Sequence, residues 1–111
     1  MTPAPRRDLL PGTLDMLILK TLSAQAMHGY GIAQHIQRLS DDVLQVEEGS
    51  LYPALQRMRQ KGWITAAWGQ TPNHQRARYY RITAAGRRRL GEEESAFADV
   101  LAAIRRVMRP A

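Results

Sequence analysis

The sequence predicts a mainly α-helical fold that carries one small β-hairpin. Apolar residues recur at helical spacing in four segments, which indicates four helices. Between the third and fourth segments the residues change to β-branched and aromatic types around a turn-like stretch, which is typical of two strands. Glycine and polar clusters separate the segments, so the expected order is helix, helix, helix, hairpin, helix.

The first helix is expected to begin at Thr13, which is a suitable N-cap, after a flexible arm over residues 1–12. Asp15 would then lie in the first turn, where the helix dipole favours an acidic group. We expect Gly29 to end this helix as its C-cap. The apolar face comprises Leu14, Leu17, Ile18 and Leu22.

The second helix is expected to run from about Tyr30 to the polar cluster at 40–42. Its apolar positions are four and then three residues apart, as one helix face requires. They are Ile32, Ile36 and Leu39. Residues 43–46 form a short extended link to the next helix.

The third helix is predicted from the acidic and capping residues near position 48 to Lys61-Gly62. Ser50 can act as its cap, and Pro53 is tolerated if it lies in the first turn, where N–H groups lack intrahelical partners. The residues expected to face the core are Leu51, Leu55 and Met58.

The hairpin is expected as one strand over 63–68, a turn over 69–75 and a second strand over 79–83. Thr83 then caps a long last helix that ends near Met108. This order is the layout of a winged helix-turn-helix, in which the third helix enters the major groove of DNA and the hairpin, or wing, lies along the backbone.

The polar face of the third helix suits contacts to base edges and phosphates. Its candidate DNA-binding residues are Ser50, Tyr52, Gln56, Arg57 and Gln60. Gln56 suits adenine and Arg57 suits guanine, whereas Tyr52 suits a phosphate or a thymine methyl group. The alternative is an ordinary amphipathic helix with a solvated polar face.

The wing is rich in arginine and has no acidic residue between positions 75 and 89. Guanidinium groups beside tyrosines suit phosphate contacts, although a solvated arginine-rich strand is also consistent with the pattern. The candidates are Arg76, Arg78, Tyr80 and Arg81. Arg87, Arg88 and Arg89 oppose the dipole at the start of the last helix. We expect Arg88 and Arg89 to pair with Glu92 and Glu93, with Arg87 left for a DNA backbone contact.

The last helix carries an apolar stripe with heptad-like steps of 7, 4, 3 and 4 residues, which favours a dimer interface. The stripe is Leu90, Phe97, Leu101, Ile104 and Met108. Packing against the first helix of the same chain is the alternative, and both can hold. The expected division is an arm over 1–12, a DNA-binding domain over 13–83 and a dimerisation helix over 84–111.

Composition fits this interpretation. The 111 residues carry a formal net charge of +6, with 44% hydrophobic and 23% charged residues, as in a folded domain with a polyanionic partner. Charge alone does not separate this from a basic protein without such a partner. No cysteine is present, which excludes disulfides, thiolate metal sites and cysteine nucleophiles. No apolar run approaches the roughly 20 residues that a membrane span needs, and no cleavable signal is found. We therefore expect a cytoplasmic protein and no membrane partner.

Four motifs closely resemble the PadR family of bacterial transcriptional regulators, in the family's order and from about residue 9 onward. They are LPGTLDMLIL at 10–19, HGYGI at 28–32, EGSLYPAL at 48–55 and YYRITAAG at 79–86. The resemblance implies a winged helix-turn-helix, a C-terminal dimerisation helix and a repressor released by a small aromatic or drug-like molecule. Ser50, Tyr52 and Pro53 would lie in the recognition helix, and Arg78, Tyr80 and Arg81 in the wing.

Some members of the family have several C-terminal helices, whereas only one fits here. The chain therefore resembles the short subgroup, which has less protein from which to build an effector pocket.

No enzyme, cofactor or metal is expected. The spacing of His28, His35 and His74 does not match that of metal ligands, and no cysteine is present to complete a site. Ser50 is not within a Gly-x-Ser-x-Gly motif and has no plausible catalytic base. Trp63 and Trp68 are expected in core or wing packing, with a ligand clamp as the alternative. A winged-helix module that binds another protein, without sequence-specific DNA binding, is the second functional hypothesis.

Overall fold

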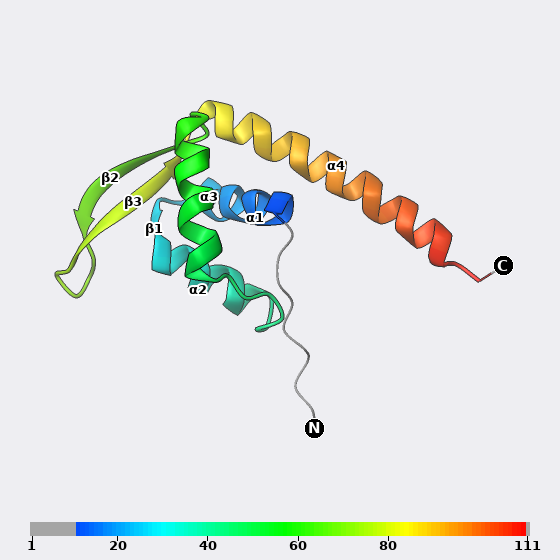
Figure 1. The fold of residues 1–111 in the computed structure, drawn as a ribbon, viewed down its shortest axis with the longest axis horizontal. Coiled ribbons are helices and arrows are strands. Elements are labelled where there is room, and N and C mark those ends of the chain that lie inside the picture. Colours follow the sequence, from blue (N-terminus) through cyan, green and yellow to red (C-terminus); the bar gives the residue numbers. More distant parts are fainter. Residues whose placement is uncertain (1–10, 111) are drawn as a thin grey trace, which may run out of the picture.

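The computed structural model describes residues 11–110, and these form the predicted mainly helical fold with a small antiparallel sheet (Figure 1). The elements in order are α1 (Pro11–Ala24), β1 (Met27–His28), α2 (Gly29–Leu39), α3 (Glu48–Gln60), β2 (Ile64–Gln70), β3 (Arg76–Ile82) and α4 (Ala84–Met108). Helices α1 to α3 followed by the β2–β3 hairpin are the predicted winged helix-turn-helix, and α4 projects from it.

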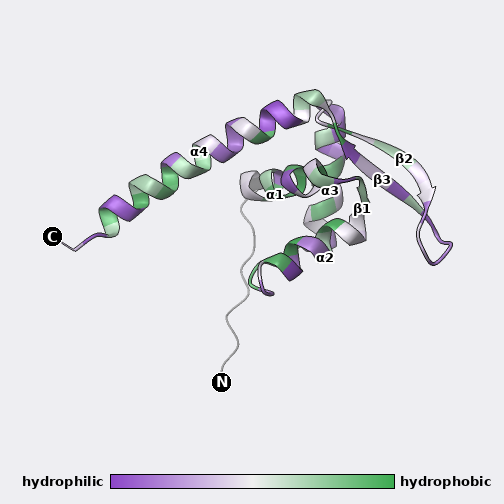
Figure 2. Ribbon diagram, turned by 180° about the vertical axis from the view of Figure 1, so that it is seen from behind, coloured by the Kyte–Doolittle hydropathy of each residue, from purple (hydrophilic) through white to green (hydrophobic). Residues whose placement is uncertain are grey.

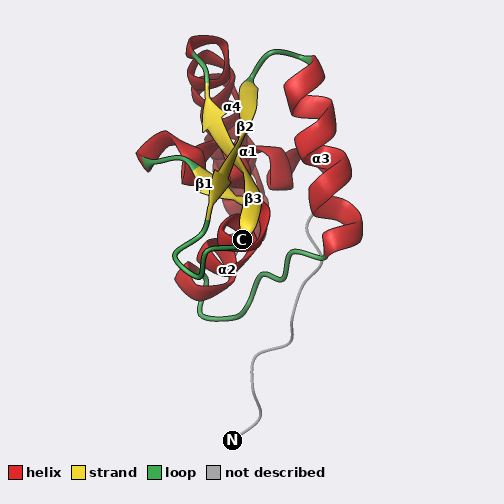
Figure 3. Cartoon of the chain, turned by 90° about the vertical axis from the view of Figure 1, so that its left-hand side faces the viewer, coloured by secondary structure: helices red, strands yellow, loops and turns green. Residues whose placement is uncertain are grey.

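The sheet contains one strand more than expected. Its order is β1-β3-β2, and both pairings are antiparallel. The short strand β1 pairs Met27 with Tyr80 and His28 with Tyr79, so it ties the start of α2 to the wing. The wing strands extend closer to the turn than predicted, over Ile64–Gln70 and Arg76–Ile82. Figure 3 shows α3 lying beside this sheet.

One apolar core holds the helices and the base of the wing together. Burial of these side chains from water is the main favourable term for a domain of this size. The fully buried large side chains are Ile18, Leu19, Leu22, Ile32, Leu51, Leu55, Met58 and Ile64. The predicted core face of α3 is therefore confirmed. In α2, Ile32 and Ile36 are buried as expected, but Leu39 is 69% exposed because the helix ends there, beyond the reach of the core.

The boundaries of α1 differ from the prediction at both ends. The helix begins at Pro11, because proline is tolerated in a first turn, so Thr13 is inside the helix and does not cap it. Residues 1–10 of the predicted arm lie outside the described residues. The helix ends at Ala24, and Gly29 is not its C-cap. Instead, Gly29 is the first residue of α2 and His28 is the N-cap of that helix. The Nδ1 atom of His28 accepts a hydrogen bond from the backbone N–H of Gly31 at 3.0 Å.

Helix α3 begins earlier than the capping pattern predicts. Glu47 is in the N-cap position without a side-chain cap bond, and Ser50 is already inside the helix. Ser50 therefore does not act as the cap. Pro53 lies beyond the first turn, so the helix forgoes one backbone hydrogen bond at that position.

The base of α4 is locked to the domain. Thr83 caps the helix as predicted, with its Oγ1 accepting the N–H of Gly86 at 3.0 Å. Gly86 is essential there, because a Cβ on it would lie 2.1 Å from the carbonyl oxygen of Trp63. Beyond the base, α4 extends over α1 and past it, which gives the molecule a long dimension of 57 Å (Figure 1).

Candidate nucleic-acid interface

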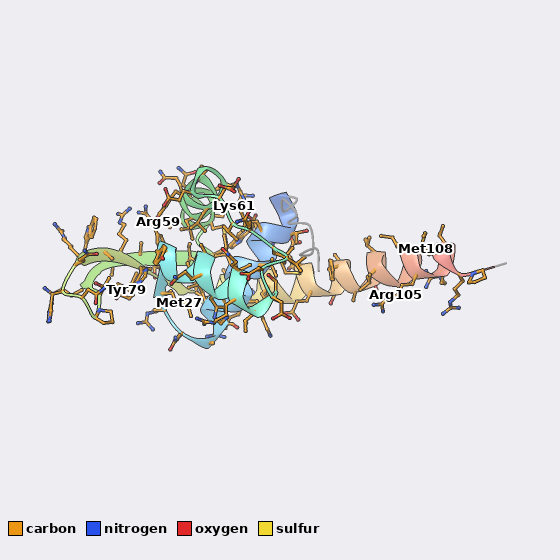
Figure 4. All side chains as sticks on the ribbon, turned by 90° about the horizontal axis from the view of Figure 1, so that it is seen from below. Met27, Arg59, Lys61, Tyr79, Arg105 and Met108 are labelled. Atoms are coloured by element: carbon orange, nitrogen blue, oxygen red, sulfur yellow. The ribbon has the colours of Figure 1, made fainter. Side chains whose placement is uncertain are left out.

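The outward face of α3 presents a stripe of polar side chains opposite its buried face. Tyr52, Gln56 and Arg59 follow one another at i, i+4 and i+7, so they share one side of the helix. This side is turned toward the wing, and Figure 4 shows Arg59 on the wing side of α3. The ring of Tyr52 packs directly against the backbone of Gly29 at the start of α2. A Cβ added to Gly29 would lie 2.9 Å from the Tyr52 hydroxyl oxygen, so this contact restricts the position of the ring.

An open groove lies between this stripe, the start of α2 and the wing. Its volume is about 890 Å³. Tyr30 and Gln34 of α2 line it, and Gln34 Nε2 donates to the Tyr30 hydroxyl at 2.9 Å. His28, which caps α2, lies in the wall as well. The groove therefore presents hydrogen-bonding groups and aromatic faces from three separate elements.

The two faces of the wing differ in what they carry. Side chains that are directly opposite in a sheet share a face, and successive residues alternate. Trp68 is paired with Arg78, and Gln70 with Arg76, so these side chains lie on one face. That face is continuous with the buried Ile64 at the base of the wing, and it forms one wall of the groove.

The charge of the groove is positive. Arg59 contributes from α3, and Arg76 and Arg78 contribute from β3. No aspartate or glutamate is among the described residues that line it. Because opposing cations repel one another across a groove, an anion between them is favoured, and a phosphate backbone fits this requirement.

Arg57 is not where the sequence analysis expects it. It forms an ion pair with Asp15 of α1, whose side chain is largely buried. This pair ties α3 to α1 and occupies the guanidinium that was predicted to read guanine. Asp15 lies outside the first turn of α1, so its partner is Arg57 and not the N-terminal end of the helix dipole.

Tyr80 and Arg81 are also placed differently from the prediction. Tyr80 is on the same face of β3 as Arg78 but nearer the base of the wing, where it is only 5% exposed and belongs to the core. Because Tyr80 also lines the groove, its contact with DNA stays a prediction. Arg81 is exposed on the opposite face of the wing, beside Tyr79, and does not line the groove.

The remaining predicted residues of α3 are exposed but lie around the groove, not within its lining. Ser50 and Pro53 lie in the first half of α3, and Gln60 is its last residue. The groove thus brings together five of the predicted site residues, which are Tyr52, Gln56, Arg76, Arg78 and Tyr80.

Sequence reasoning missed Arg59 and assigned Trp68 to packing. Arg59 could have been found, because it continues the spacing of Tyr52 and Gln56 by three residues. Trp68 is exposed, with the Arg76 Cζ 4.3 Å and the Arg78 Cζ 5.4 Å from the centre of its ring. Only the cross-strand register reveals that contact.

Two of the three arginines at the start of α4, Arg87 and Arg89, contact groups of their own chain. Arg89 pairs with Glu92 at 3.5 Å and with Glu93, and its Cζ lies 4.9 Å from the centre of the Trp63 ring. The Arg89–Glu93 pair was predicted, but among the described residues Arg88 has no acidic partner. The Arg87 guanidinium nitrogens lie 3.5 Å from the carbonyl oxygen of Ser23, so this side chain is turned to α1.

The predicted apolar stripe of α4 divides into two parts. Leu90 is 7% exposed and packs in the core of its own domain, so it does not belong to a free face. Farther along, hydrophobic residues recur to the end of the helix, which appear as green segments of the ribbon in Figure 2. The large exposed ones are Phe97, Val100, Ile104, Val107 and Met108, and Leu101 is partly exposed. Val100 and Val107 widen the stripe beyond the predicted set.

A winged helix with a cationic groove beside its third helix defines a class of nucleic-acid-binding regulators. Residues 18–92 match the model of the transcriptional regulator PadR-like family, which is most of the chain. The chain therefore belongs to this family, as its motifs predicted.

Individual relatives agree with the family. An uncharacterised protein of Lysinibacillus sphaericus is 34% identical over 95 residues, which cover 86% of this chain and 87% of the relative. A transcriptional regulator from Clostridium thermocellum superposes with a TM-score of 0.81 at 26% identity, covering 88% of this chain and 95% of that one. A PadR-like transcriptional regulator from Bacillus cereus gives 0.77 at 25%, covering 90% and 95%. The family and these solved neighbours are regulators, not enzymes.

Among residues 11–110, no helix combines the length and the apolar character that a membrane crossing requires.

Proposed function

We propose that this chain is a sequence-specific DNA-binding repressor that acts as a homodimer in the cytoplasm. The observation that carries the proposal is the single groove that combines the outward stripe of α3 with the arginine-bearing face of the wing. One element supplies groups that can read base edges, and the other supplies cations for the adjacent backbone. A protein–protein module would have no need of this cationic wall.

Base reading is assigned to Gln56 and Arg59. Gln56 is exposed and can make the two hydrogen bonds that an adenine edge offers, and Arg59 replaces Arg57 as the guanine candidate. Among the described residues no carboxylate pairs with Arg59. Its guanidinium is therefore available to DNA, whereas that of Arg57 is held by Asp15.

Backbone contacts are assigned to Arg76 and Arg78 on the groove wall. Ser50 and Pro53, at the exposed start of α3, and Gln60, at its end, are proposed to flank the reading residues along the major groove. Arg81 is proposed to contact only the outer side of a phosphate strand, because it lies on the far face of the wing.

Dimerisation is assigned to the far half of α4. Phe97, Leu101, Ile104 and Met108 keep the predicted steps of 4, 3 and 4 residues. A second copy of the same helix offers the matching stripe, and it would also bring two reading helices to one palindromic site.

A small aromatic effector is proposed at the notch between α1 and α4. The notch has a volume of about 270 Å³ and is lined by Met16, Leu17, Phe97 and the stems of Lys20 and Glu94. An aromatic ring suits such an apolar site. Because α1 holds α3 through the Asp15–Arg57 pair, a ligand that shifts α1 also shifts the reading helix.

Footprinting on the DNA upstream of the chain's own gene tests the main proposal, followed by titration of the protected duplex and a scrambled one at several salt concentrations. The proposal expects a specific affinity well above the non-specific one and a steep salt dependence. A reporter behind the protected site should be repressed. Equal, salt-insensitive binding of both duplexes would instead support the protein–protein module.

A further inference from the structure

Trp68 is an unusual residue for its position in the wing. It is a large aromatic residue, 58% exposed, on the strand that carries no charge. Burial does not explain it, since more than half of its surface remains in water. Its neighbours are the two groove-facing arginines of the adjacent strand, Arg76 and Arg78.

The register explains how one indole reaches two guanidinium groups. Trp68 is directly opposite Arg78, which places the Arg78 Cζ 5.4 Å from the centre of the ring. Arg76 lies two residues nearer the tip on the same face, at the diagonal position that long side chains can span. Its Cζ is 4.3 Å from the ring centre, within the range of a cation–π contact.

No carboxylate among the described residues competes with the indole for these arginines. The Arg78 Nε is buried without a hydrogen-bond partner, so protein hydrogen bonds do not hold that group in place either. Among the described residues, the indole is therefore the interaction partner that both arginines share.

An aromatic holder has a property that an acidic one lacks. A glutamate at position 68 would also orient the arginines, but it would cancel their charge and occupy their N–H groups. An indole contacts the face of a guanidinium and leaves its charge and edge N–H donors free for a phosphate. Holding the side chains in advance also lowers the conformational entropy lost on binding.

We propose that Trp68 is a positioning residue that holds Arg76 and Arg78 toward the groove for contact with DNA phosphates. This inference rests on the proposed function, because it assigns the two arginines to the DNA backbone. Trp68 acts through them and makes no base contact itself.

The test compares Trp68→Leu with Trp68→Phe in the full chain. Trp68→Leu should weaken operator binding by about two- to fivefold and lower the slope of log affinity against log salt, because the arginines lose their orientation. Trp68→Phe keeps an aromatic face and should restore most of both. Since the side chain is exposed, the melting temperature of both variants should stay near that of the wild type.

A double-mutant comparison separates positioning from direct contact. In an Arg76→Ala/Arg78→Ala background, Trp68→Leu should cause no further loss of affinity. An additional loss of the same size there would overturn the proposal, since the indole would then touch DNA itself. Equal losses for the Leu and Phe variants would overturn it as well.

A measurement without DNA completes the design. In the free protein, the Arg76 and Arg78 side-chain protons should show ring-current shifts in NMR that vanish in Trp68→Leu and persist in Trp68→Phe. If the wild type binds DNA but Trp68→Leu titrates unchanged, this inference alone fails. If the wild type binds no duplex, the proposed function fails and this inference with it.

Discussion

The base of α4 and its far half differ in where their apolar side chains go. Leu90 at the base is buried in the core of its own domain, whereas Ile104 in the far half is 52% exposed and, among residues 11–110, is not part of that core. The arginines of α3 show the same contrast. Arg57 is paired with Asp15, and Arg59 has no acidic partner among the described residues. Side chains with a partner inside the domain, such as Leu90 and Arg57, stabilise the fold. Ile104 and Arg59, which lack such a partner among the described residues, are available for the proposed contacts with a second copy of the chain and with DNA.

The strongest test of this contrast is Ile104→Asp. In the proposed dimer the carboxylate would be buried without a partner, and an uncompensated buried charge costs about 3–5 kcal/mol. We expect sedimentation to show a monomer and operator binding to fall together with dimerisation. Ala102→Asp is the matched control, because it lies on the opposite side of the same helix. An unchanged dimer in Ile104→Asp would remove this half of α4 from the interface.

Gly86→Ala tests the other half of the contrast, at the base of α4. The added Cβ would meet the carbonyl oxygen of Trp63 at 2.1 Å and Ile82 Cγ1 at 2.8 Å, so backbone must move. We expect a loss of about 1–3 kcal/mol in the free energy of unfolding, measured by denaturant titration. Gly91→Ala is the control, since nothing lies near its added Cβ, and helix propensity should stabilise it by up to about 1 kcal/mol. Equal melting of both variants would mean that the base of α4 is not locked to the domain.

Arg57→Ala and Arg59→Ala form a pair on one helix. Arg59→Ala should leave stability unchanged and cost about 1–3 kcal/mol of operator discrimination. Arg57→Ala should lower the free energy of unfolding by roughly 0.5–1 kcal/mol, because its ion pair is partly exposed to solvent, and should affect DNA binding less. Thermal melting and duplex titration of both variants check this. The reverse pattern would restore Arg57 as the reading residue.

The two faces of the wing give the smallest expected difference. Arg78→Ala should lower the salt slope of DNA binding by about one unit, for specific and random duplexes alike, because phosphate contacts carry little sequence information. Arg81→Ala, which removes the same charge from the far face, should change the slope by less. Equal slopes for the two variants would mean that DNA contacts both faces of the wing.

The sequence predicted much of the fold because the relevant signals are local. Helical spacing identified the buried face of α3, and Thr83 identified the start of α4. The errors arose where the outcome depends on tertiary pairing. The strand β1 exists only because β3 is beside it, and no pattern within Met27–His28 indicates that partner.

The same reason explains which site residues were misassigned. The burial of Tyr80 was not predicted, because the strand pattern alone does not show where the wing joins the core. Arg57 and Arg59 are the same residue type on one helix, so the sequence does not distinguish them. Only the position of Asp15 on α1 decides which of the two guanidinium groups is held in an ion pair. Trp68 requires the register of two strands to be known before its contact with Arg76 is visible.

The central claim is that the groove-facing side of α3 reads sequence, and Gln56→Ala tests it most directly. The measurement is a pair of titrations, with operator and with scrambled duplex, at one salt concentration. We expect operator affinity to fall by about 1–3 kcal/mol while non-specific binding is largely kept, so that the specificity ratio drops. Thermal stability should hardly change, since the side chain is exposed. Equal losses on both duplexes, or unfolding of the variant, would contradict the account.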